Sequence, residues 1–70
     1  MRIEEEYRLG ELVSFNYQPS RKSKNGQVRR LAVVIAIMGN DILTETRKSK
    51  QRFHQGEMTQ VIRHGIVAEV

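Results

Sequence analysis

The sequence predicts an all-β domain, a small and strongly bent antiparallel barrel of five strands with at most one short helical turn. Short segments alternate in polarity or are rich in β-branched residues, and glycine-containing turns separate them. A chain of 70 residues has room for one core only. We therefore expect a single barrel domain over residues 11–70, preceded by an N-terminal acidic arm or edge element over residues 1–10.

The first predicted strand covers residues 13–17, where valine and aromatic side chains alternate with serine and asparagine. This period of two is typical of a half-buried strand, and it places Phe15 in the core. Pro19 ends the strand because proline lacks the amide hydrogen that a sheet ladder needs. The polar loop of residues 20–27 closes with an Asn-Gly pair, which tolerates the positive φ of a tight turn.

The second predicted strand, residues 28–38, is apolar on both faces. Such a strand is central in a sheet, or bends to serve two parts of a barrel core. A helix is the competing interpretation, because leucine, alanine and methionine favour helices. The stiff β-branched run of residues 33–35 favours the strand.

The rest of the chain predicts short strands joined by polar turns. A turn at Gly39-Asn40 leads to a strand over 41–46, and a loop over 47–50 leads to a strand over 51–54 around Phe53. A turn over 55–57 follows, then one short helical turn over 58–61 with 62–64 beyond it. A bend or bulge at Gly65 precedes a last strand over 66–70.

The basic residues are concentrated in two runs, at predicted loops and the ends of adjoining strands. Acidic residues are absent between positions 11 and 41 and between 45 and 57, so we expect neither run to be neutralised locally. The first and third loops of a meander emerge at the same end of the sheet, which predicts one cationic surface. A net charge of +4 and a pI near 10.0 suit an anionic partner such as nucleic acid. The runs are Arg21, Lys22, Lys24, Arg29 and Arg30, and Arg47, Lys48, Lys50 and Arg52.

Three stretches resemble the WYL domain, a small Sm-like β-barrel found in many bacterial transcription regulators. They are VSFNYQPSRKSKNGQVRRL, similar to the family's opening hairpin; GNDILTET, where the family carries its Trp-Tyr-Leu triplet; and QRFHQGEMTQV, similar to its closing Arg/Phe segment. The resemblance implies an Sm-like or Src-homology-3-like barrel that binds nucleotides or single-stranded nucleic acid. The residues that carry this role over are Tyr17, Arg29, Arg30, Arg52 and Phe53.

The chain departs from the family pattern at several positions. Asp41 and Ile42 stand where the family has Trp and Tyr, Val33 stands where proline is common, and Glu57 replaces the second arginine of the closing segment. The roles of those family residues are therefore not transferred to this chain.

The predicted nucleic-acid-binding residues divide by side-chain chemistry. Lys22, Lys24, Lys48 and Lys50 suit phosphate contacts, whereas Arg29, Arg30 and Arg52 lie nearer the strands and suit bidentate contacts. Tyr17 and Phe53 flank the basic loops and are candidates for stacking on a base, with packing in or beside the core as the more frequent alternative. Arg21 and Arg47 complete the predicted cationic surface.

Other chemistries find little support. His54 and His64 have no third ligand at a known metal spacing, so no metal or cofactor is expected. The serines lack a local His/Asp context and no glycine-rich phosphate loop is present, so we expect no enzyme. Cysteine is absent, the longest apolar stretch is too short to span a bilayer, and the N-terminus lacks signal-peptide features, which together favour a cytoplasmic protein away from membranes.

The leading functional hypothesis is a non-enzymatic barrel that binds nucleic acid, single-stranded or duplex, as an accessory or regulatory factor in transcription. The alternative is a protein-interaction module of the kind that phages and plasmids encode, docking on a partner protein or forming a homo-oligomer through its edge strands. A small-ligand sensor is a third hypothesis. Glu4, Glu5 and Glu6 are candidates for an acidic arm that covers the basic end.

Overall fold

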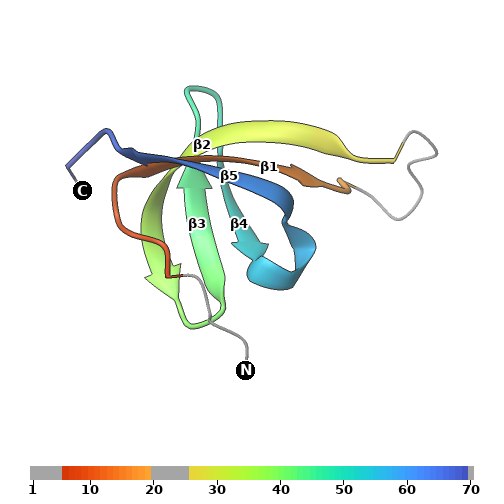
Figure 1. Cartoon of the computed structure of the whole chain (residues 1–70), viewed down its shortest axis with the longest axis horizontal. Helices are drawn as coiled ribbons and strands as arrows, with labels where there is room; N and C mark the ends of the chain where they lie inside the picture. Colours follow the sequence, from red (N-terminus) through yellow and green to blue (C-terminus); the bar gives the residue numbers. More distant parts are fainter. Residues whose placement is uncertain (1–5, 20–25, 70) are drawn as a thin grey trace.

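The computed structural model describes residues 6–19 and 26–69. It has five antiparallel strands in one sheet, in the order β4-β3-β2-β1-β5 (Figure 1). The all-β prediction is confirmed. The elements are β1 (Glu11–Tyr17), β2 (Val28–Met38), β3 (Asp41–Glu45), β4 (Lys50–His54), a single 3-10 turn η1 (Gln55–Glu57) and β5 (Thr59–Ile66).

The predicted central strand has the expected bounds, and the helix alternative for it is wrong. β2 pairs with β1 on one side and with β3 on the other. Its register against β3 shifts between Val34 and Ala36, which marks a β-bulge. Bulges bend the strand that contains them, so one long strand serves both halves of the curved sheet.

The end of the chain differs from its prediction. Residues 58–61 form no helical turn. The helical turn of this region is η1, which begins three residues earlier and is closed by the hydrogen bond from the Met58 amide to the Gln55 carbonyl, at 3.2 Å. The last strand then begins at Thr59 and pairs with β1, where residues 66–70 were predicted. Gly65 forms the expected bulge, with φ 98° and a register shift in β1 opposite it. Position 70 lies outside the described residues.

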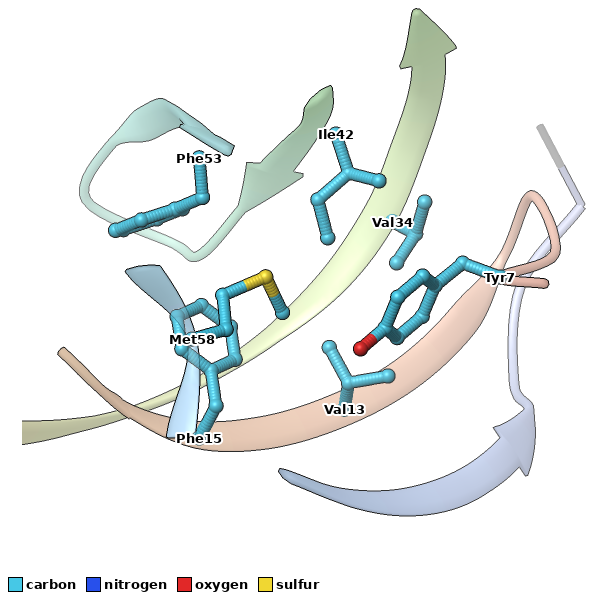
Figure 2. Close-up of a cluster of buried hydrophobic side chains, with 7 residues drawn as sticks. All are labelled: Tyr7, Val13, Phe15, Val34, Ile42, Phe53 and Met58. Atoms are coloured by element: carbon cyan, nitrogen blue, oxygen red, sulfur yellow. The ribbon is translucent and has the colours of Figure 1, made fainter. Parts of the chain in front are cut away.

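The core consists of side chains that converge from every strand except β5 and from the residues just before β1 and β5 (Figure 2). Val13, Phe15, Val34 and Ile42 have no exposed surface. The Phe15 and Phe53 rings meet edge to face with centroids 4.9 Å apart, an arrangement that adds to their burial. The cluster is Tyr7, Val13, Phe15, Val34, Ile42, Phe53 and Met58, with Tyr17 and Val61 packed against it.

The two edge strands, β4 and β5, each pair on one side only among the described residues. The sheet described is therefore open along this seam. η1 is the connection between its two edges and carries the chain from one to the other.

The described part of the predicted acidic arm or edge element, from residue 6, is irregular and ends in a turn at Leu9 and Gly10. The Gly10 amide donates to the Val34 carbonyl at 2.7 Å, and the Gly10 carbonyl accepts from the amide of Val67 at 2.9 Å. Gly10 has φ 84°, and a Cβ there would lie 1.9 Å from the Ala68 carbonyl oxygen. Only glycine fits this crossing of three backbone segments.

Candidate nucleic-acid interface

The second basic run lies on the hairpin made by β3, β4 and the turn between them. Arg47 and Lys48 are in the turn, and Lys50 and Arg52 alternate along β4, so that both side chains leave the same face of the strand. All four residues are exposed. We call Arg47, Lys48, Lys50 and Arg52 the basic hairpin; its turn projects from one end of β3 in Figure 1.

Hydrogen bonds within the turn hold its shape. The Thr46 amide donates to the Ser49 carbonyl at 2.8 Å. The amides of Lys48 and Ser49 both donate to Thr46 Oγ1 at 3.2 Å. A threonine hydroxyl that accepts from the following amides mimics a backbone turn. The backbone that carries Arg47 and Lys48 is therefore ordered before any partner arrives.

Arg30, on the neighbouring strand β2, donates hydrogen bonds to this turn and to β3. Its Nε donates to Thr44 Oγ1 at 3.0 Å, and its Nη2 donates to the carbonyls of Thr44 and Ser49 at 3.3 and 3.4 Å. Its guanidinium carbon lies 5.6 Å from the centre of the Phe53 ring, within cation–π range. Arg30 was predicted to suit bidentate contacts with a ligand, but acceptors within the protein occupy its donors.

The predicted convergence of the two basic runs can be followed only in part. Arg21, Lys22 and Lys24 lie outside the described residues, so the loop that carries most of the first run is not part of the described surface. Arg30 is the member of that run that contacts the turn of the second run, through Ser49.

Arg29 lies on the opposite face of β2 from Arg30, because consecutive residues of a strand point to opposite faces. Its Nη1 donates to Asn16 Oδ1 at 3.0 Å and its Nη2 to Ser14 Oγ at 2.9 Å. Ser14 Oγ also lies 3.1 Å from His64 Nε2. This polar cluster joins β2, β1 and β5 on the outer face of the sheet and lies apart from the basic hairpin.

The two predicted stacking aromatics take different positions. Phe53 is 3% exposed and packs against Phe15 and Tyr17 beneath the Arg30 guanidinium. It is a core residue and has no free face for a base. Tyr17 is half-buried, and its ring meets Phe53 edge to face with centroids 4.8 Å apart.

The expectation that the second run is not neutralised locally is wrong. The register of β3 against β4 places Glu45 opposite Lys50, with a carboxylate oxygen 3.9 Å from Nζ. Asp41 accepts from Arg52 Nε at 2.8 Å and lies 2.8 Å from His54 Nδ1. These hydrogen bonds, first with His54 and then with Arg52, hold the pKa of Asp41 below its ordinary value of 3.8. Arg47 and Lys48 remain as cations with no ion pair among the described residues.

A second charged cluster, which sequence analysis missed, joins the start of β1 to β5. Glu11 accepts from Arg63 Nε at 2.6 Å and Nη2 at 2.9 Å, and its side chain is only 5% exposed. Arg63 also donates to the Glu6 carbonyl and lies 5.1 Å above the Tyr7 ring. The hydrogen bond from Arg63 lowers the pKa of Glu11 below 4.5, against the opposing effect of burial. We call Tyr7, Gly10, Glu11 and Arg63 the N-terminal junction.

The Glu4–Glu6 arm can be placed at one residue only, since positions 4 and 5 lie outside the described range. The Glu6 carbonyl accepts a hydrogen bond from Arg63 of the N-terminal junction.

A cleft of about 610 Å³ opens at the other end of β3, between the β2–β3 turn and η1. Tyr7 and Met58 contribute apolar surface, and His54 and Glu6 contribute polar surface. Its lining includes no lysine or arginine from the described part of the chain. An anionic ligand therefore finds no counter-charge in this cleft.

Residues 6–19 and 26–69 contain no group of three or more His, Cys, Asp or Glu side chains arranged to hold a metal ion. Within the same ranges, no helix is long and apolar enough to cross a membrane. No family model, curated protein or solved structure matches the chain.

Proposed function

We propose that this protein is a non-enzymatic β-domain that binds nucleic acid through the basic hairpin, as an accessory or regulatory factor in transcription. The observation that carries the proposal is the turn at Arg47 and Lys48. Both cations are exposed and without an acidic partner among the described residues, on a backbone that Thr46 and Arg30 hold in place. A pre-ordered backbone reduces the conformational entropy lost when its cations meet phosphates.

The electrostatic part of such binding has a measurable signature. Each phosphate that a lysine or arginine neutralises releases counterions, so affinity falls with salt by about 0.7 log units per log unit of salt for each contact on a single strand and about 0.9 on a duplex. Arg47, Lys48, Lys50 and Arg52 are the described residues expected to make these contacts. Arg29 contributes at most secondary contacts. Tyr17, half-buried against Phe53, and Phe53, which is buried, are not part of the proposed interface.

The test is a titration of labelled oligonucleotides at several salt concentrations with the natural protein and two charge variants. R47Q/K48Q removes both turn cations, and we expect it to weaken binding and to flatten the salt dependence. R8Q is the control for one unit of charge, because Arg8 is exposed on the segment before β1. An affinity that does not change with salt concentration contradicts the proposal. So does a loss of affinity in R8Q as large as that in R47Q/K48Q.

We also propose that the domain is a complete barrel of the Sm-like kind that the resemblance to the WYL domain implies. The support is the strand order β4-β3-β2-β1-β5, which leaves β4 and β5 as the two edges, together with the short η1 that joins them. Amide hydrogen exchange tests the closure. Protection of outward-facing amides on both edge strands supports a barrel, and rapid exchange of those amides contradicts it.

A specific observation favours self-association as a second candidate function. Leu31 and Ile62 are both more than half exposed and flank Ser14 from either side on the outer face of the sheet. Ile62 belongs to β5, which is an edge strand in the open sheet described, and this candidate requires that edge to pair with a second copy of the chain rather than to close a barrel. We expect I62K to abolish any dimer seen by light scattering. A monomer at all concentrations contradicts this candidate.

A further inference from the structure

Every aromatic ring of this chain is placed, because its two tyrosines and two phenylalanines all fall in the described residues and tryptophan is absent. Tyr7, Phe15 and Phe53 are each at most 8% exposed. Tyr17 is half-buried, with its ring centre 4.8 Å from that of Phe53 and 6.0 Å from that of Phe15. Single-strand binders hold bases on exposed aromatic faces, each worth about 1–3 kcal/mol. The fold has used these rings for its core.

The arginine donors of β2 are also occupied. An arginine that contacts guanine specifically presents two free donors to it. Arg29 donates from both terminal nitrogens to Asn16 and Ser14, and Arg30 donates from all three nitrogens to Thr44 and Ser49. In the basic hairpin, Lys50 and Arg52 each lie beside a carboxylate, and Arg47 and Lys48 are exposed in the turn without an ion pair among the described residues. These four side chains are the cations that the hairpin offers to phosphates.

We infer, resting on the proposed function, that the partner is double-stranded nucleic acid, held mainly by its phosphate backbones and without aromatic stacking on the bases. A duplex carries one negative charge per roughly 1.7 Å of axis, twice the density of one strand of the same helix, so cations alone favour it. A β-hairpin is narrow enough to enter a groove of about 12 Å, where its turn meets phosphates on both sides. The Thr46–Ser49 bonds keep the turn compact for this approach.

The experiment measures fluorescence anisotropy of the full chain with short labelled duplexes, one rich in A·T and one rich in G·C, and with their separated strands. We expect the duplexes to bind more tightly than the strands and the two compositions to bind equally. We expect K48Q to reduce the duplex salt slope by about one unit, the loss of one phosphate contact. Y17L is the matched aromatic variant and should leave single-strand affinity unchanged.

The outcomes separate the two claims. Tighter binding of single strands, affinity that follows base composition, or a loss of single-strand binding in Y17L overturns the duplex inference and leaves the proposed function standing. Absence of salt-dependent binding to any of these oligonucleotides overturns the proposed function itself. A circular dichroism spectrum of each variant matching the natural protein establishes that a lost affinity is not a lost fold.

Discussion

The N-terminal junction and the basic hairpin each join an arginine to a carboxylate, and they differ in how far the pair is removed from water. In the junction, the side chains of Glu11 and Arg63 are 5% and 29% exposed. In the hairpin, those of Asp41 and Arg52 are 24% and 60% exposed. The distances are alike, at 2.6 and 2.8 Å. The pairs differ in their surroundings and also in contact geometry, because Arg63 donates two hydrogen bonds to Glu11 whereas Arg52 donates one to Asp41.

This difference assigns the pairs different tasks. A buried pair contributes little net energy when intact, but loss of one partner leaves a charge that water cannot fully solvate. Glu11 and Arg63 therefore fix the segment around Tyr7 onto β5. An exposed pair exchanges its partner for water or another ion at small cost. Asp41 and Glu45 accordingly adjust the charge of the basic hairpin while contributing little to the fold.

The largest expected effect is that of G10A in the junction. A methyl group there would lie 1.9 Å from a backbone oxygen, and the backbone has φ 84°. Overpacking and the left-handed conformation together predict a loss of about 3 kcal/mol in the free energy of unfolding, measured by urea denaturation. G39A is the matched control, because Gly39 has φ 63° and open space around it. Equal losses in the two variants would show that the crossing at Gly10 is not tight.

E11Q tests the buried pair. The neutral amide would leave Arg63 partly buried without its counter-charge, and we expect a loss of about 2 kcal/mol, below the roughly 3–5 of a fully buried pair because Arg63 keeps some access to water. D41N on the hairpin should leave the urea midpoint nearly unchanged. A larger loss in D41N than in E11Q would reverse the comparison.

The pH dependence of stability should come from the same pair. The folded-state pKa of Glu11 lies below its ordinary value of 4.5, so the unfolded chain binds a proton more readily than the folded one. The contribution of Glu11 to stability is therefore complete above pH 4.5 and is lost as the pH falls from there through the folded-state pKa. As the pH falls across this range, the urea midpoint of E11Q should fall less steeply than that of the natural protein. Equal slopes for the two proteins would mean that groups other than Glu11 cause the loss of stability in acid.

The strands that were predicted correctly are those whose neighbours impose a pattern. β1 alternates because one of its faces lies on the core, and β2 is apolar on both faces from Leu31 to Met38 because it is central. β5 was misplaced because Val61 is its only residue that is even half-buried, which leaves no period of two to detect. Its position comes from pairing with β1, a long-range choice that local sequence does not display.

The candidate site likewise combines features that the local sequence displays with features that depend on strand pairing. The basic residues of the hairpin are visible in the sequence, but their partners follow from register. Glu45 and Lys50 flank the four-residue turn symmetrically, so a hairpin register centred on that turn would have predicted their pairing. Glu11 and Arg63 are 52 residues apart, and only the return of β5 to β1 brings them together.

R30K tests whether the hairpin turn depends on the adjoining strand. Lysine keeps the charge but cannot reach Thr44 and Ser49 together, so we expect a loss of about 1 kcal/mol in stability and faster hydrogen exchange at the Thr46 amide. R29K is the matched control, because Arg29 bonds to Asn16 and Ser14 on the other face of β2. Equal exchange at Thr46 in the two variants would mean that the turn is self-sufficient.

The smallest expected effect distinguishes hairpin charge from total charge. E45Q removes the carboxylate 3.9 Å from Lys50 Nζ, so Lys50 should meet phosphate without a competing acid. Two unit charges at this separation in water interact by about 1 kcal/mol, which predicts a rise of up to about fivefold in duplex affinity with little change in stability. E69Q changes the net charge equally at an exposed position near the C-terminus. If both variants raise duplex affinity alike, the net charge of the protein governs binding. If only E45Q raises it, the charge of the basic hairpin governs binding.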